Sequence, residues 1–361
     1  DMPTAGGGHE PALLPFTVQV DRTSRRAHFE LGDAAFTLGP DEYSPWIPVE
    51  FGSGRATAHG ICRFRVTSFD DPFGVYVTPI NLDPERPDMP ISNPPHYAIA
   101  LAKLHGPYAT LGLAEDTWGV NEGIIDHDTF LQLTNDIEEE RQSMFFAALE
   151  RLRRGALVCV FDATDRVQHM FFRYLDPDHP ANEGKDTQQH KDVIDKLYRR
   201  ADQLVGQTLQ RLGPRDALLV ISDHGFKTFQ RGVNLNSWFR ANGYLFLKSD
   251  PLKGPLPEVL PQTRYEVEHI DWPRTRAYTN GLAGFYLNIK GRENEGCVDP
   301  AEASALKREI IDALRGLPDL EREGEAITEL WASEEIYQGP YRDNGPDVIV
   351  GYKPGYRADW D

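Results

Sequence analysis

The chain has 361 residues, 40% of them hydrophobic and 11% aromatic, which is the composition of a folded protein that can bury a sizeable core. Its formal net charge of −18 argues against a general nucleic-acid-binding surface, which would be basic. No apolar run reaches the roughly 18 residues of a membrane-spanning helix. The three cysteines, Cys62, Cys159 and Cys297, are widely spaced and predict a reducing, cytoplasmic compartment without a disulfide framework.

The first part of the chain predicts a small antiparallel domain. Residues 1–11 are glycine-rich and are expected to be mobile. From Phe16 to about residue 80, short alternating apolar runs are separated by Gly-Asp and Gly-Pro turns, which is typical of a β-meander. A proline-rich connector follows. We therefore predict that residues 12–95 form an inserted β-rich subdomain with its connector, and that residues 96–361 form an α/β core.

The core region predicts helices and two buried strands. Helical spacing of apolar residues indicates helices at 96–104, 128–153, 190–212 and 301–316. The apolar runs that end at Phe161 and at Ser222 each stop abruptly at acidic and histidine residues. Such runs are typical of strands in a parallel sheet that is covered on both faces. Ligands bind outside the carboxyl ends of such strands, so both clusters are placed where an active site is expected.

Four residues in these clusters have the chemistry of metal ligands. Asp165 and His169 are four residues apart, so one helical turn brings them to the same face. Asp223 and His224 are adjacent at a strand end, where their side chains would diverge and could serve two ions. Two carboxylates and two imidazoles suit Zn²⁺ or Mn²⁺ better than Ca²⁺. The alternative is that the aspartates cap helices and the histidines are ordinary residues. Two clusters at consecutive strand ends favour metal binding.

Neighbouring polar residues are weaker candidates. Lys227, Arg231 and Asn234 follow the second cluster, where they could contact a phosphate oxygen, although a solvated loop explains them equally well. His179 is flanked by a proline and is predicted to be a loop residue. Trp118 is predicted to pack against the core.

The stretches "FDATDRVQHMFFRYLDPDHP" and "ISDHGFKTFQRGVNLNSWFRANGYL" resemble the type I phosphodiesterase/nucleotide pyrophosphatase branch of the alkaline phosphatase superfamily. The similarity continues through "HGICRFRV", "EDTWGVNEG" and "GPDVIVGYKPGYRADW", so it covers nearly the whole chain. It implies an alkaline-phosphatase-like α/β fold, with a mostly parallel sheet flanked by helices and an inserted antiparallel subdomain. It also implies hydrolysis of a small phosphate ester or nucleotide with two divalent ions, zinc or alternatively manganese. By this resemblance, Asp165 and His169 would bind one ion, and Asp223 and His224 the other.

The chain also departs from the family pattern. Family members have an early strand that ends in a metal-binding aspartate, then a threonine or serine nucleophile, and a further metal-binding histidine near the C-terminus. None of these is found here, so the resemblance implies an incomplete core that associates with a further segment of the same protein. Alternatives are a phosphoglycerate-mutase-like or other enzyme of the superfamily, or a catalytically inactive metal-binding fragment.

Overall fold

The computed structural model describes residues 12–52, 57–248, 269–282, 284–319 and 321–359, together with the backbone of two short strands, β1 (Met2–Pro3) and β2 (His9–Glu10). The chain divides into two compact units. Unit 1 comprises Asp1–Leu175 and Thr187–Ser222, and unit 2 comprises Asp176–Asp186 and Asp223–Asp361. Residues 1–11, which are expected to be mobile, lie outside the described residues apart from β1 and β2. The predicted domain boundary at residue 95 stays a prediction.

Unit 1 begins with antiparallel strands, as the alternating runs predict. The strands are β3 (Thr17–Asp21), β4 (Arg26–Leu31), β5 (Ala34–Leu38), β6 (Ile47–Phe51), β7 (Ala58–Cys62), β8 (Phe64–Ser68), β9 (Gly74–Val77) and β10 (Asn81–Leu82). They pair as β3-β4-β5, β10-β7-β6 and β8-β9. Phe29 stacks on Phe36 with ring centroids 5.0 Å apart, and Phe64 packs against both rings. This aromatic cluster lies inside the core of the β-rich part.

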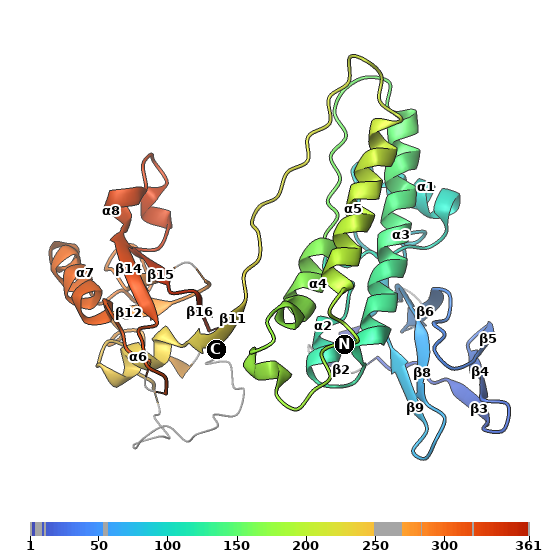
Figure 1. Ribbon diagram of the computed structural model, residues 1–361, viewed down its shortest axis with the longest axis horizontal. Coiled ribbons are helices and arrows are strands. Elements are labelled where there is room, and N and C mark those ends of the chain that lie inside the picture. The colour runs from blue at the N-terminus through green and yellow to red at the C-terminus, as the bar shows by residue number, and fades with distance from the viewer. Residues whose placement is uncertain are drawn as a thin grey trace. The chain divides into compact units, whose positions relative to one another are not determined.

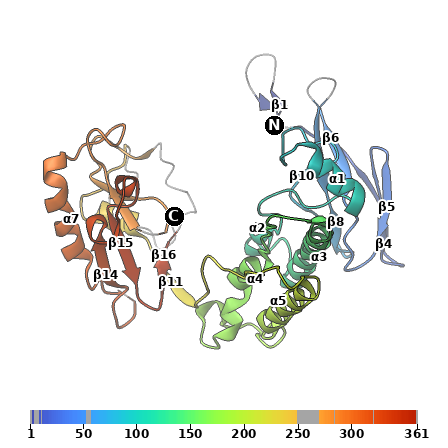
Figure 2. The ribbon, with the colours of Figure 1, turned by 90° about the horizontal axis from the view of Figure 1, so that it is seen from above.

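The helices of unit 1 follow, and all but the short helix Thr117–Asn121 were predicted from the sequence. They are α1 (His96–His105), α2 (Thr117–Asn121), α3 (His127–Arg151), α4 (Ala163–Phe171) and α5 (Val193–Leu209), with a 3₁₀ turn, η2 (Phe172–Leu175), after α4. Asp126 caps α3 by accepting a hydrogen bond from the Thr129 amide at 2.8 Å. Phe130, Val167, Phe171 and Ile194 pack into one core that joins α3, α4 and α5. Figures 1 and 2 show these three helices alongside one another.

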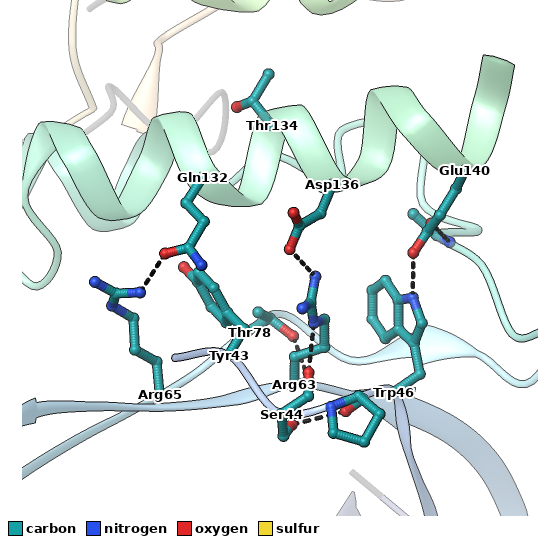
Figure 3. Close-up of polar contacts among 12 residues, drawn as sticks. Tyr43, Ser44, Trp46, Arg63, Arg65, Thr78, Gln132, Thr134, Asp136 and Glu140 are labelled. Atoms are coloured by element: carbon teal, nitrogen blue, oxygen red, sulfur yellow. Dashed lines mark hydrogen bonds and ion pairs between the residues drawn. The ribbon is translucent and has the colours of Figure 1, made fainter. Parts of the chain in front are cut away.

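One side of α3 is attached to the β-rich part by polar contacts (Figure 3). Arg63 donates to Asp136 at 2.8 Å and to the Ser44 carbonyl at 2.7 Å. Further along α3, the Trp46 indole donates to Glu140 at 2.7 Å. Because α3 also packs against α4, these contacts link the β-rich part to the helix that bears Asp165 and His169.

The two predicted core strands are not confirmed. Residues 157–161 and 217–221 are extended, but their side chains are not buried: Val158, Val160, Leu219, Val220 and Ile221 are between 70% and 88% exposed. Within the described part of the chain, no backbone hydrogen bond joins either segment to another strand. Full burial of an apolar strand requires paired strands beside it and elements that cover both faces, and no described strand pairs with these segments.

Unit 2 is built on an antiparallel sheet with strand order β12-β13-β15-β14. The strands of this sheet are β12 (Ala277–Thr279), β13 (Gly284–Leu287), β14 (Ile327–Ala332) and β15 (Val348–Tyr352). The helices of unit 2 are α6 (Leu235–Ala241), α7 (Pro300–Leu314) and α8 (Ser333–Ile336). It also has two 3₁₀ turns, η3 (Pro180–Asn182) and η5 (Arg342–Asn344). Leu306, Ile310 and Leu314 of α7 pack on one face of the sheet (Figure 2).

Parallel pairing between the described strands is found for β11 (Phe229–Val233) with β16 (Gly355–Ala358), and the other sheets are antiparallel. The chain therefore has a mixed α/β fold, but a mostly parallel core sheet is not confirmed. The apolar runs at 284–289 and 347–351 have the pattern of strands and correspond to β13 and β15. The sequence pattern does not indicate β11, β12, β14 or β16.

Candidate active site

Asp165 and His169 lie together on one side of α4, as their spacing predicts. The other side of the helix is apolar, since Val167 and Phe171 are buried in the core with α3 and α5. The Asp165 and His169 side chains are 29% and 46% exposed, and His169 Nε2 lies 3.3 Å from Asp165 Oδ1. A carboxylate oxygen and an imidazole nitrogen thus converge at a point that remains accessible.

Asp223 and His224 form a second pair, in unit 2. Their side chains are 87% and 53% exposed, and His224 Nε2 lies 3.4 Å from Asp223 Oδ2. The expected divergence of these neighbours is therefore wrong, because the chain bends at Asp223 and does not continue as an extended strand. His224 Nδ1 is 3.1 Å from the Gly225 carbonyl oxygen, to which only a protonated Nδ1 can donate. In the neutral ring that tautomer leaves the Nε2 lone pair directed at the Asp223 carboxylate.

The donor separations fit a shared cation. Two ligands of a tetrahedral zinc ion, each about 2.0–2.1 Å from the metal, lie about 3.3–3.4 Å from each other. Both pairs have this separation. Two other carboxylate–imidazole pairs in the chain are closer: His59 Nδ1 is 2.8 Å from Asp88, and His190 Nε2 is 3.0 Å from Asp128. Those are ordinary hydrogen-bond distances. The two candidate pairs thus have the chemistry and spacing of metal ligands.

The helix-capping alternative does not explain these aspartates. The residue at the N-cap of α4 is Asp162, which makes no side-chain capping bond and instead forms an ion pair with Arg141 of α3. Asp165 is inside the first turn, where a negative charge also interacts favourably with the helix dipole. Asp223 precedes no helix, because residues 224–228 lie outside any helix.

Each pair supplies two donors. Asp165 and His169 belong to unit 1, whereas Asp223 and His224 belong to unit 2. In the described part of the chain, no group of three or more histidine, cysteine, aspartate or glutamate residues has the arrangement of a metal site. Further ligands for either ion would therefore have to come from water, substrate or another segment.

A family model described as type I phosphodiesterase / nucleotide pyrophosphatase matches residues 100–359. The chain belongs to this family. No curated protein and no solved structure matches it. Membership in the phosphodiesterase family supports hydrolysis of phosphoric esters, with a small phosphate ester or nucleotide as substrate, in a family that is generally metal-dependent. In the described residues, no helix combines the length and apolar character needed to cross a membrane.

The three weaker candidates of this phosphodiesterase-family chain differ in their surroundings. Lys227 is exposed. Arg231 is held by two carboxylates, with Nε 2.7 Å from Asp319 and Nη1 2.8 Å from Glu321, and these contacts raise its pKa, the Glu321 hydrogen bond most of all. Asn234 caps α6 by accepting from the Ser237 amide at 2.8 Å. Arg231 and Asn234 therefore have structural partners within unit 2.

The structure also shows the surroundings of His179 and Trp118. His179 is a loop residue as expected: its Nδ1 accepts from the Ala181 amide at 3.1 Å, so the protonated Nε2 donates to the Phe229 carbonyl at 2.7 Å. The prediction that Trp118 packs in the core is wrong, because the side chain is 65% exposed. Its helix α2 is a single short turn, and only Gly119 of that turn is buried.

Sequence reasoning also overlooked two buried acidic residues, Glu138 on α3 and Glu115. They are 7% and 3% exposed, and three of their four carboxylate oxygens have no hydrogen-bond partner among the described residues. Burial raises the pKa of Glu138, and the charge of Glu115 adds to this shift. Glu138 looks like part of a solvated charge run in the sequence, and no local signal distinguishes it from Glu139.

Proposed function

We propose that the chain is a metal-dependent phosphodiesterase or nucleotide pyrophosphatase that uses two divalent ions, zinc or manganese. Asp165 and His169 would hold one ion, and Asp223 and His224 the other. The observation that carries this proposal is the separation of 3.3–3.4 Å between oxygen and nitrogen in each pair, together with membership of the phosphodiesterase family. Two such ions would neutralise the phosphate charge and orient the substrate for an in-line displacement.

The protein's own groups orient these ligands. Asp165 Oδ2 accepts from Arg166 Nη1 at 3.0 Å, which leaves Oδ1 directed at His169. The Gly225 carbonyl has the corresponding effect on His224, because it fixes the proton on Nδ1. Contacts of this kind fix the orientation of a metal ligand, and a carbonyl that accepts from one histidine nitrogen also increases the basicity of the other nitrogen. Lys227, Arg231 and Asn234 remain candidates for contact with substrate phosphate.

No residue of the chain is assigned as nucleophile. Thr164 and Ser222 are the hydroxyl residues within the two motifs, and Thr164 donates to the Phe161 carbonyl at 3.3 Å. We propose that a further segment of the protein supplies the nucleophile and the last metal-binding histidine, and that the complete core contains a mostly parallel sheet.

Metal content and activity of aspartate variants test the proposal. In Asp165→Asn and Asp223→Asn, the amide is a poor ligand, so each should lose about one equivalent of bound zinc or manganese, measured by elemental mass spectrometry. In the full-length protein, which includes the proposed nucleophile segment, hydrolysis of bis(p-nitrophenyl) phosphate should fall by about a hundredfold or more in each variant. Asp88→Asn is the matched control, since Asp88 also pairs with a histidine but at hydrogen-bond distance.

Unchanged metal content in both variants would rule out the assigned ligands. Two equivalents of bound metal without turnover of the diester by the full-length protein would instead favour the alternative of a catalytically inactive metal-binding protein.

A further inference from the structure

Helices α3 and α5 of unit 1 border a groove of about 410 Å³, and none of the four candidate metal ligands lines it. The two helices lie alongside one another (Figures 1 and 2). Small-molecule sites usually have volumes of about 300–1,000 Å³, so the groove has the size of such a site. Its α5 side carries three cations and two carboxamides, which form one stripe at helical spacing: Lys196, Arg199, Arg200, Gln203 and Gln207.

The cations of this stripe are only partly neutralised. Arg199 donates from Nε to Asp195 at 2.7 Å, and Arg200 Nη2 lies 3.4 Å from the Glu139 carboxylate. A guanidinium has five N–H donors, so each arginine keeps donors for a ligand. Lys196 is exposed, and no described carboxylate forms an ion pair with its ammonium group. The groove therefore presents one uncompensated positive charge together with further charged donors.

The groove changes from charged to neutral along its length. At 1.5 Å per residue the stripe is about 16 Å long, with the cations in its first half and the glutamines in its second half. Glu139 of α3 pairs with Arg200 of α5. Further along both helices, the Arg211 guanidinium carbon lies 4.3 Å from the Phe146 ring centroid, so α3 and α5 run in the same direction. Gln142 of α3 therefore adds a third carboxamide to the neutral half.

A phosphate monoester with a polar body matches this arrangement. Charged donors bind phosphate oxygens strongly, and a monoester carries a charge of about −1.5 to −2 at neutral pH. A carboxamide both donates and accepts, so glutamines can bond the edge of a nucleobase, as they do with adenine. A purely apolar ligand does not fit, because Leu204 is the one apolar residue among those that line the groove.

We propose that the groove between α3 and α5 binds a nucleoside monophosphate. The phosphate would lie among Lys196, Arg199 and Arg200, and the base would lie toward the three glutamines. Hydrolysis of the pyrophosphate bond of a nucleotide releases a compound of this class, so the groove would bind a product of the enzyme's own reaction. This last link rests on the proposed function, whereas the binding itself does not.

Calorimetric titration of the full-length protein with adenosine monophosphate tests this proposal. We expect one molecule to bind in the groove, and to bind equally well to Asp165→Asn, because Asp165 does not line the groove. Adenosine lacks the phosphate and inorganic phosphate lacks the base. Each should therefore bind to that variant at least about tenfold more weakly.

Two substitutions in the groove should act in opposite directions. Lys196→Gln removes the uncompensated cation and should weaken binding of adenosine monophosphate by about tenfold. Glu139→Gln removes the carboxylate that opposes the phosphate and should tighten binding by about threefold. Neither should lower the melting temperature, since both side chains are exposed. Lys103→Gln is the matched control, because Lys103 is an exposed lysine of α1 that does not line the groove.

Three results would overturn the inference. Absence of binding is the first. Equal losses of affinity in Lys103→Gln and Lys196→Gln are the second, since they would show a response to net charge alone. Binding that disappears in Asp165→Asn is the third, because it would place the ligand at a metal ion and support the metal proposal instead. Binding that persists in Asp165→Asn, in a protein whose wild type holds neither zinc nor manganese, would support the groove and reject the metal proposal.

Discussion

At the residue scale, Glu138 shows how a single buried carboxylate affects stability. Its side chain is buried on α3, with one oxygen accepting from Gln142 at 3.2 Å and the other without a partner. Burial raises its pKa above the ordinary value of 4.5. The folded state therefore holds this proton more tightly than the unfolded state. The resulting stabilisation is fully present below about pH 4.5 and is lost as the pH rises through the raised pKa.

Glu138→Gln is expected to stabilise the protein at neutral pH. Glutamine keeps an oxygen for Gln142 and removes the buried charge, so the free energy of unfolding should rise by about 1 kcal/mol at pH 7. The gain should disappear near pH 4, where wild-type Glu138 is itself neutral. Chemical denaturation at both pH values measures the difference. Glu139→Gln, at a side chain 71% exposed, is the control and should change stability little. A gain of equal size at both pH values would contradict this explanation.

The candidate ligands show what a sequence can predict for single residues. The convergence of Asp165 and His169 follows from helical geometry, which depends only on their spacing. The surroundings of Arg231 could not be predicted in this way, because its partners Asp319 and Glu321 are nearly ninety residues further along the chain. Likewise, the orientation of His224 depends on the Gly225 carbonyl and on a local conformation that the sequence does not specify.

At the scale of elements, Arg63 is the main polar link between the β-rich part and α3. It forms an ion pair with Asp136, donates to the Ser44 carbonyl, and lies over the Tyr43 ring with its guanidinium carbon 4.9 Å from the ring centroid. Only 12% of the Arg63 side chain is exposed, whereas Asp136 is 35% exposed. Water therefore screens one partner only, so the pair contributes more than a surface ion pair does.

Arg63→Met should lower the free energy of unfolding by about 2 kcal/mol, since it leaves Asp136 without its ion-pair partner and the Ser44 carbonyl without its guanidinium donor. Urea denaturation of unit 1 would measure the loss. Arg199→Met is the control: Arg199 also pairs with an aspartate, at 2.7 Å, but its side chain is 74% exposed, so the change should stay below about 1 kcal/mol. Equal losses in the two variants would show that burial of Arg63 is unimportant.

Elements were predictable where their stabilising contacts are local. The helical spacing of apolar residues that predicts α3, α5 and α7 marks an apolar side of each helix, which different neighbours could cover. In β3, β4 and β5, apolar and polar residues alternate, and tight turns join the strands. By contrast, β11 was expected to be a loop, since its partner β16 is more than a hundred residues away. Residues 157–161 and 217–221 have the composition of strands, but whether such a segment pairs in a sheet depends on a neighbouring strand, and no described strand pairs with them.

At the scale of the whole molecule, each unit has its own hydrophobic core. In unit 1 the cores form around Phe29 and around Phe130 and Phe171. In unit 2 a separate core contains Phe285, Leu287 and Leu314, none of which is exposed. Separate cores of this kind make each unit a candidate for independent cooperative unfolding. We therefore expect differential scanning calorimetry to resolve two transitions.

Leu314→Ala assigns these transitions. Leu314 is fully buried where α7 packs on the unit 2 sheet, and truncation leaves a cavity that costs about 2–5 kcal/mol. For a unit of this size that loss lowers one melting temperature by about 10 °C, and the other transition should stay where it is. Phe130→Ala in unit 1 should do the opposite, shifting only the transition that Leu314→Ala leaves unchanged. A single transition shifted by both substitutions would mean that the two cores unfold together, and the units would then be parts of one cooperative structure.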